Sequence, residues 1–120
     1  MSENFPVCRS QLLQDLSIQL GRNLKGIRYS NEQLRFRNYR EKDGVECLEI
    51  NARAYSGELI SVFLWETGQG QMILTPRAPK KHKRSSVERN DFAFDALTLN
   101  ETVRLLGDFF KMGSWAAKRK

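Results

Sequence analysis

The stretch VECLEINARAYSGELISVFLW, residues 45 to 65, decides the fold. Every second residue in its first half is apolar, a period typical of a strand with one buried face. The apolar positions are Leu48, Ile50, Ala52 and Ala54, and between them lie Glu49, Asn51, Arg53 and Tyr55. The triplet SGE then predicts a short turn. Residues 59 to 65, rich in branched and aromatic side chains, predict a more buried strand, so we expect two antiparallel neighbours here.

The segments on either side extend this pattern into a sheet. LRFRNYR (34 to 40) also alternates, and EKDG (41 to 44) behind it predicts a turn. On the other side, ETGQGQ (66 to 71) predicts a tight turn that leads into a strand at MILT (72 to 75). Four strands joined by such short loops predict an antiparallel meander with one covered face and one solvated face.

Two helices are predicted to cover the sheet. From Ser10 to about Asn23, leucines recur every three or four residues, the stripe of an amphipathic helix. DFAFDALTL (91 to 99) predicts a further extended segment. Within it begins TLNE (98 to 101), which fits a capping box for a helix that ends near Gly113. The predicted fold class is α+β: a twisted antiparallel β-meander packed against an N-terminal and a C-terminal helix, in one domain of 120 residues.

The segment TPRAPKKHKRSS, residues 75 to 86, carries two prolines and five cations. Prolines cannot donate ladder hydrogen bonds, so they end the preceding strand. Residues 76 to 90 lack apolar periodicity and are predicted to form a basic loop, and residues 116 to 120 a frayed basic tail. We favour an electrostatic arm that contacts phosphates; a nuclear-import signal and a solubilising loop stay open. The predicted contacts are Arg77, Lys80, Lys81, Lys83 and Arg84.

The charge balance favours a polyanionic partner. Twenty Lys and Arg against 14 Asp and Glu give a net charge of +6, and such cations can replace counterions along phosphates. A charge that serves only solubility is the alternative. Cys8 and Cys47 lack metal-ligand spacing and predict reduced thiols. Without an apolar leader or a run of about 20 apolar residues, we expect an intracellular protein with no membrane partner. It would be cytoplasmic, or nuclear in a eukaryotic or viral source.

One face of the predicted sheet combines cations with aromatic rings. Arg35, Arg37 and Tyr39 share a face of one strand, and Arg53 and Tyr55 share a face of the next. Guanidinium groups engage phosphates, and aromatic rings stack on unpaired bases. The prediction is a non-enzymatic surface for single-stranded DNA or RNA. The alternative is a solvated face whose arginines pair with carboxylates such as Glu49 or Glu46.

Catalysis has little support in the sequence. It contains no glycine-rich phosphate loop, no nucleophile elbow and no histidine–carboxylate set with metal-ligand spacing. Asp91 and Asp95 could in principle hold a magnesium ion, which makes a small metal-dependent nuclease the third-ranked function. We therefore expect a protein that is not an enzyme and carries no cofactor or metal.

A protein–protein adaptor, of viral or mobile-element type, is the second-ranked function. Phe109, Phe110, Met112 and Trp115 near the C-terminus are residue types enriched in interface cores. Their helical spacing favours core packing instead, so the sequence leaves both roles open and ranks packing first.

The order of a meander followed by LTLNETVRLLGDFF, a strand that runs into a helix, resembles one known class. This is the Whirly and transcriptional positive-coactivator type of single-stranded DNA-binding domain. GELISVFLWETGQGQMILTPR is similar to the central hairpin of that class, with its Gly–Gln turn. The resemblance covers roughly residues 34 to 112 and is one of pattern. It implies a four-stranded sheet, a homodimer formed through the C-terminal helix, and single strands that lie across the sheet.

Overall fold

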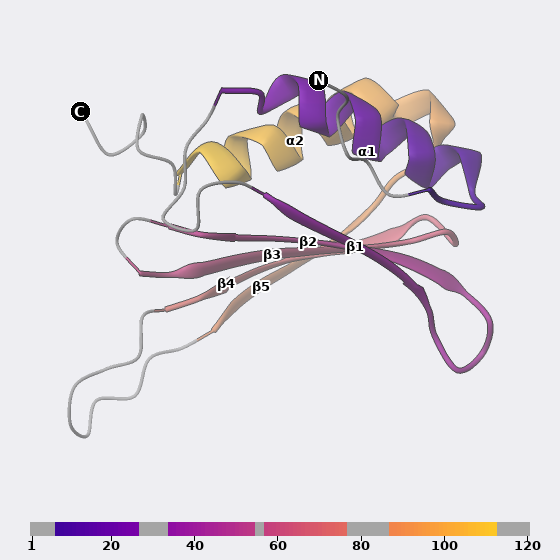
Figure 1. Ribbon diagram of the computed structural model, residues 1–120, viewed down its shortest axis with the longest axis horizontal. Helices are drawn as coiled ribbons and strands as arrows, with labels where there is room; N and C mark the ends of the chain where they lie inside the picture. Colours follow the sequence, from indigo (N-terminus) through magenta and orange to yellow (C-terminus); the bar gives the residue numbers. More distant parts are fainter. Residues whose placement is uncertain (1–6, 27–33, 55–56, 77–86, 113–120) are drawn as a thin grey trace.

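The computed structural model describes residues 7–26, 34–54, 57–76 and 87–112, and the folded chain has two layers (Figure 1). Both helices, α1 (Gln11–Asn23) and α2 (Leu99–Met112), lie on the same face of one antiparallel sheet. The strands are β1 (Arg35–Arg40), β2 (Glu46–Arg53), β3 (Leu59–Trp65), β4 (Gln69–Thr75) and β5 (Glu88–Ala93), in the order β1-β2-β3-β4-β5. The predicted α+β class, with a meander between two helices, is confirmed. Within the described residues, neither helix is long and apolar enough to cross a bilayer.

The sheet has five strands, so the predicted count of four was wrong. β4 begins at Gln69, inside the segment predicted to be a turn, because the turn needs only the residues up to Gly68. Gly68 has a φ of 95°, a conformation that glycine adopts without strain. A side chain there would also meet the Phe94 carbonyl oxygen, 2.7 Å from an ideal Cβ. Gly68 therefore makes the turn short enough for the next residues to pair.

Gly70 is a glycine for a different reason, namely a ring that lies against the strand. It pairs with Leu64 on one side and with Phe92 on the other. A Cβ on Gly70 would lie 2.3 Å from Cζ of Phe92, so any side chain would displace that ring. The glycine that weakens the strand signal in the sequence is the residue that lets β5 pack.

Residues 88 to 90, predicted to belong to the basic loop, form the first half of β5 instead. The sequence ERNDFA carries almost no apolar signal because β5 is an edge strand paired only with β4. Glu88 and Asn90 are exposed although their alternation places them on the helix side, since the core is not continued there. Phe94 at the end of β5 is buried in the core, and Phe92 packs against it.

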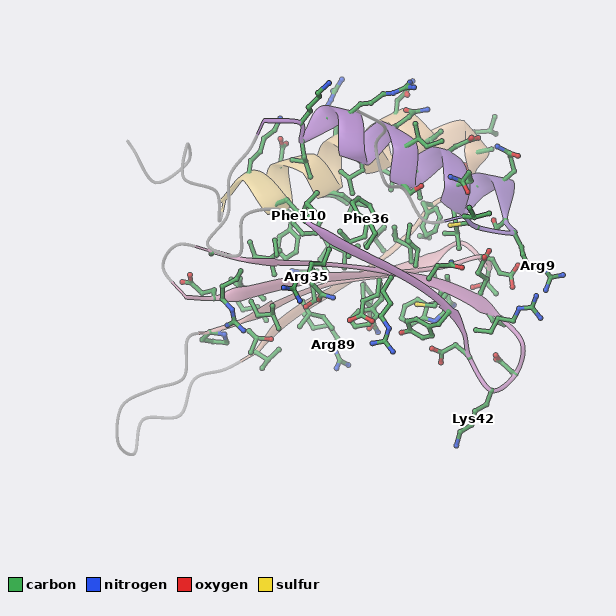
Figure 2. All side chains as sticks on the ribbon, in the orientation of Figure 1. Arg9, Arg35, Phe36, Lys42, Arg89 and Phe110 are labelled. Carbon is green, nitrogen blue, oxygen red and sulfur yellow. The ribbon has the colours of Figure 1, made fainter. Side chains whose placement is uncertain are left out.

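The core lies between the sheet and the two helices, as Figure 2 shows for Phe36 and Phe110. Alternate residues of β2 and β3 fill its sheet side, and the leucine stripe of α1 fills its helix side. Its fully buried members are Leu13, Leu16, Leu20, Leu48, Ile50, Ala52, Val62, Leu64, Leu106 and Phe110. The helices approach closely at Gly107, where an ideal Cβ would lie 2.4 Å from the Asn23 amide oxygen.

Each helix begins at a polar cap, and α1 also depends on a residue of the sheet. The Ser10 hydroxyl accepts a hydrogen bond from the Leu13 amide (3.3 Å). The buried Glu46 carboxylate of β2 accepts from the backbone amides of Arg9 (2.7 Å) and Ser10 (2.8 Å). A charged strand residue thus fixes the start of a helix more than 30 positions away in sequence.

The predicted capping box at TLNE was placed three residues too late. Asp95 is the cap: its carboxylate accepts from the Leu97 and Thr98 amides, each at 2.9 Å, and the Thr98 hydroxyl accepts from the Asp95 amide. A short 3-10 turn, η1 (Ala96–Thr98), therefore precedes α2. An aspartate side chain accepts hydrogen bonds from helix N-terminal amides as readily as a serine or threonine side chain. The sequence therefore contains two overlapping candidate caps, Asp95 and Thr98, and the 3-10 turn begins at the earlier one.

Candidate functional site

The face of the sheet that points away from both helices is uncovered in the described structure, and we call it the open face. Strand alternation and cross-strand register decide which side chains it carries. Its polar and aromatic members are Arg35, Arg37, Tyr39, Glu49, Asn51, Arg53, Ser61, Phe63, Trp65, Gln69, Gln71, Thr75, Arg89 and Asp91. Figure 2 shows Arg89 on this side and Phe36 on the helix side.

The structure brings together four of the residues predicted to bind nucleic acid. Arg35, Arg37 and Tyr39 lie side by side on β1, and Arg53 lies on the same face at the end of β2. The Arg53 guanidinium donates to the Gly57 carbonyl oxygen at 2.9 Å. Six others lie outside the described residues: Tyr55, Arg77, Lys80, Lys81, Lys83 and Arg84. Their predicted roles stay predictions.

Arg37 connects the aromatic and ionic parts of the open face. Its guanidinium carbon lies 5.2 Å from the centre of the Tyr39 ring, and its Nη1 lies 3.8 Å from Oε1 of Glu49. The sequence left open whether the arginines pair with carboxylates, and for Arg37 and Glu49 this pairing occurs. The Arg37 side chain is 73% exposed, so the pair belongs to the class worth at most about 1 kcal/mol. Such a pair can open when a phosphate competes for the guanidinium.

Two aromatic residues of the open face, Phe63 and Trp65, were not predicted from the sequence. They stack along β3 with ring centres 6.0 Å apart and an interplanar angle of 19°. Residues 59 to 65 have apolar side chains on both faces, and the segment was therefore interpreted as a buried strand. The signal was present in the period: Ile60, Val62 and Leu64 continue the core face, which leaves the odd positions for the other side.

Tyr39 and Trp65 flank a small residue in one row across three strands. Tyr39 pairs with Cys47, and Cys47 pairs with Trp65. Burial, followed by a hydrogen bond to the Cys47 thiol, raises the pKa of Tyr39. Burial is also the main cause that raises the pKa of Cys47. Both groups are neutral at physiological pH, so this row offers uncharged, partly apolar surface.

Cys47 and Cys8 are both free and buried, as predicted for reduced thiols. Cys47 points to the open face, whereas Cys8 lies in the core on the helix side. Asn38, a helix-side residue of β1, donates to the sulfur of Cys8 at 3.6 Å. The two thiols therefore lie on opposite faces of the sheet.

The charges on the open face are unevenly distributed along the strands: the middle row combines Arg37, Glu49 and Asp91, and arginines predominate at one end. Arg35 and Arg89 stand at the two ends of one row, on the edge strands β1 and β5, and Arg53 lies one step further out. We call this the arginine end. The opposite end has the aromatic row and the two hairpin turns, which carry Glu41, Asp43 and Glu66. A ligand on this face meets cations at one end and rings with carboxylates at the other.

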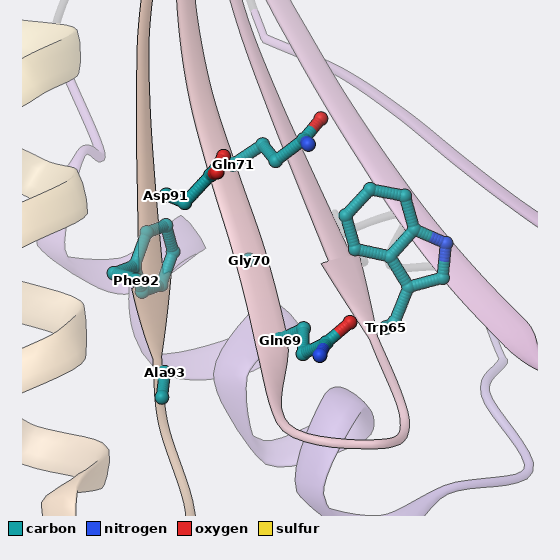
Figure 3. Close-up of a pocket in the computed structure, with 7 residues that line it drawn as sticks. All are labelled: Trp65, Gln69, Gly70, Gln71, Asp91, Phe92 and Ala93. Atoms are coloured by element: carbon teal, nitrogen blue, oxygen red, sulfur yellow. The ribbon is translucent and has the colours of Figure 1, made fainter.

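Two shallow hollows flank Trp65. The first, about 350 Å³, extends toward β5 and is lined by Trp65, Gln69, Gly70, Gln71, Asp91 and Ala93, among others (Figure 3). The second, about 380 Å³, lies toward the β1–β2 turn and includes Glu41 and Asp43. In Figure 3 the indole stands on one side of the first hollow and Asp91 on the other, with the two glutamines between them.

The two aspartates considered as a magnesium pair have separate positions. Asp91 lies on the open face opposite Gln71, whereas the Asp95 carboxylate caps η1. Among the described residues, no group of three or more His, Cys, Asp or Glu side chains is arranged to hold a metal ion.

The residues that suggested an adaptor surface belong largely to the core. Phe110 is fully buried and Phe109 packs against the core, with the two rings in an edge-on contact at 5.9 Å. The favoured packing role of these two residues is therefore confirmed. Trp115 and the Met112 side chain lie outside the described part of the chain. The predicted homodimer through this helix stays a prediction.

No protein-family model matches the chain, and no curated protein or solved structure matches it. The resemblance to the Whirly and coactivator type thus stays a prediction, and the sheet has one strand more than that resemblance implies. The function has to be argued from the residues of the open face.

Proposed function

We propose that the protein binds single-stranded nucleic acid, DNA or RNA, across the open face of its sheet, without catalysing a reaction. The observation that carries the proposal is the stacked pair Phe63 and Trp65 on a face that neither helix covers. Aromatic rings on a sheet stack on successive unpaired bases, at roughly 1–3 kcal/mol per base. The stacking tolerates any base, since each has a π-face, so binding has low sequence specificity.

The arginines supply the second requirement, which is contact with the phosphate backbone. Arg35 and Arg89 are separated by four strand spacings, about 19 Å, which is the length of several nucleotides. A strand that crosses the sheet at the arginine end places phosphates on these guanidinium groups. Its bases then point along the β-strands toward Phe63 and Trp65. This arrangement also keeps the phosphates away from the carboxylates of the hairpin turns.

The predicted basic arm starts and ends at the same end of the sheet. Pro76 follows β4 and Val87 precedes β5, and both are described residues next to the arginine end. The five predicted cations between them would add phosphate contacts where Arg35, Arg53 and Arg89 already lie. The arm and the sheet face then act on the same part of the ligand, its backbone.

The proposal is tested by fluorescence anisotropy with labelled single-stranded and duplex oligonucleotides at two salt concentrations. We expect tighter binding of the single strand, with affinity that falls as salt rises. Trp65→Leu keeps an apolar side chain but removes the π-face, and should weaken single-strand binding about tenfold. Trp65→Phe should retain most of the affinity. Both variants are first checked for an unchanged thermal midpoint.

Two results would contradict the proposal. One is the absence of binding to any oligonucleotide at low salt. The other is an equal loss for single strand and duplex in Trp65→Leu, because a duplex offers few unstacked bases. Arg104→Ala, an exposed arginine of α2 on the helix side, is the matched control and should bind like the parent protein.

A further inference from the structure

The first hollow combines one aromatic ring with three side chains that can form hydrogen bonds. Gln71 and Asp91 are directly opposite each other on β4 and β5, and Gln69 is opposite Ala93. Ala93 is small, so the hollow is open between Trp65 and Asp91. A non-specific stacking surface requires neither a hollow nor a carboxylate, since a carboxylate repels phosphate.

We propose that this hollow is a subsite that selects guanine within a bound single strand, an inference that rests on the proposed function. At about 350 Å³ it falls within the range of small-ligand sites, about 300–1,000 Å³. β3 and β5 are two strand spacings apart, about 10 Å. A purine that lies parallel on the Trp65 indole and extends sideways over β4 turns its hydrogen-bonding edge toward Gln71 and Asp91.

The hydrogen-bonding groups of the hollow favour guanine over adenine and cytosine. Guanine presents two adjacent donors, N1–H and N2–H₂, followed by the acceptor O6. A carboxylate only accepts, with two oxygens, so Asp91 can take both donors. A glutamine amide, from Gln71 or Gln69, can donate to O6. Adenine and cytosine present a ring-nitrogen acceptor where guanine has N1–H, and the Asp91 carboxylate would repel it.

The position of Asp91 on the open face also fits the proposed path of the strand. The arginine end holds the phosphates. Asp91 and Gln71 lie one row further along the strands, and Trp65 and Gln69 lie two rows further, where the bases are placed. A single base is selected there, while Phe63 stacks on a neighbour without selection. Most of the surface would stay indifferent to sequence, with one position that prefers guanine.

The test uses oligothymidylate 12-mers that carry one central guanine, adenine, cytosine or hypoxanthine. We expect the guanine oligonucleotide to bind about tenfold more tightly than the adenine and cytosine ones. Hypoxanthine lacks the N2 amino group and should fall between them. Asp91→Asn is nearly isosteric, with one oxygen replaced by an NH₂ donor, and should abolish the preference for guanine. Asp43→Asn, in the other hollow, is the matched control and should keep it.

The possible outcomes separate this inference from the proposed function. Binding of all four oligonucleotides with equal affinity would overturn the guanine subsite and leave the single-strand proposal standing. No binding to any of them would overturn both. A third outcome is tested with N-acetyl-arginine amide, a small cationic ligand. If this ligand quenches tryptophan fluorescence, Asp91→Asn abolishes the quenching, and the oligonucleotides show no preference for guanine, the hollow binds a cation instead. That result would overturn the subsite.

Discussion

Glu46 joins the sheet to α1, and replacing it should destabilise the protein more than any other single carboxylate described above. Its side chain is buried, with the residue 3% exposed, and accepts from two backbone amides at the start of the helix. The first turn of α1 contains no acidic residue. Glu46 therefore supplies, from β2, the negative charge that a helix N-terminus favours.

The size of the effect follows from these two hydrogen bonds. Bonds to a charged acceptor contribute about 1.5–3 kcal/mol each, and Glu46→Ala removes both. Part of this loss is offset, because burying the carboxylate itself costs free energy. We expect a net loss of about 3 kcal/mol in the free energy of unfolding, or roughly 10 °C in the midpoint for a chain of this size. Glu46→Gln keeps one acceptor oxygen and should lose about half as much.

Urea denaturation followed by circular dichroism measures this loss. The slope of unfolding free energy against urea should stay unchanged while the midpoint falls by about 1.5 M, at a slope near 2 kcal/mol per M. Glu41→Ala, an exposed glutamate in the adjacent turn, is the control and should change stability by less than about 0.5 kcal/mol. If Glu46→Ala matched this control, the carboxylate would not hold the helix, and our account of how α1 is positioned would be wrong.

Three further predictions address the sheet, the core and the arginine end. Gly70→Ala should destabilise by about 2 kcal/mol in urea titrations, because its methyl group would meet the Phe92 ring; an unchanged midpoint would refute this contact. Burial, followed by the charge of Glu46, raises the pKa of Cys8 to about 11. Stability should thus be constant below pH 8 and fall by about 2 kcal/mol between pH 9 and 11 as the unfolded thiol ionises first; Cys8→Ala should flatten that fall. Arg89→Ala should lower the slope of log affinity against log salt by about 0.7 for a single strand, whereas Arg104→Ala should not.

The parts of the fold that sequence predicted are those where local pattern and tertiary environment agree. β3 was predicted at residues 59 to 65 and has those bounds, since its branched residues favour strands and its even positions meet the core. The leucine stripe of α1 was equally unambiguous. Only the second half of β5 was predicted, as part of the extended segment 91 to 99, because the exposed residues 88 to 90 of this edge strand have no apolar period. Its existence depends on hydrogen bonds to β4, which no local pattern encodes.

The candidate site divides in the same way. Arg35, Arg37 and Arg53 were predicted because polar residues that alternate with apolar ones reveal an exposed face. Phe63 and Trp65 were not predicted, since aromatic side chains occur in strands both on a buried face and on a partly exposed face. The alternation with Ile60, Val62 and Leu64 hints at this face, and the pairing of Trp65 with Cys47, across from Tyr39, places the rings away from the helices. Register is a long-range property, and it fixed the half of the site that sequence left open.

Two roles of Arg37 in the proposed binding, its charge and its planar guanidinium, can be separated. The helices cover one side of the sheet, and aromatic rings are exposed on the other side. The aliphatic stems of arginines can shield such apolar surface while their charged ends stay in water. At Arg37 the guanidinium itself lies over the Tyr39 ring, with its carbon 5.2 Å from the ring centre. Arg37→Lys keeps the charge and the stem but loses the planar group that stacks on rings and bases. If the surface served only as a field of positive charge, Arg37→Lys would bind single strands as the parent does. Because the proposed site depends on stacking, we expect Arg37→Lys to weaken single-strand binding by a few-fold while the salt slope stays the same.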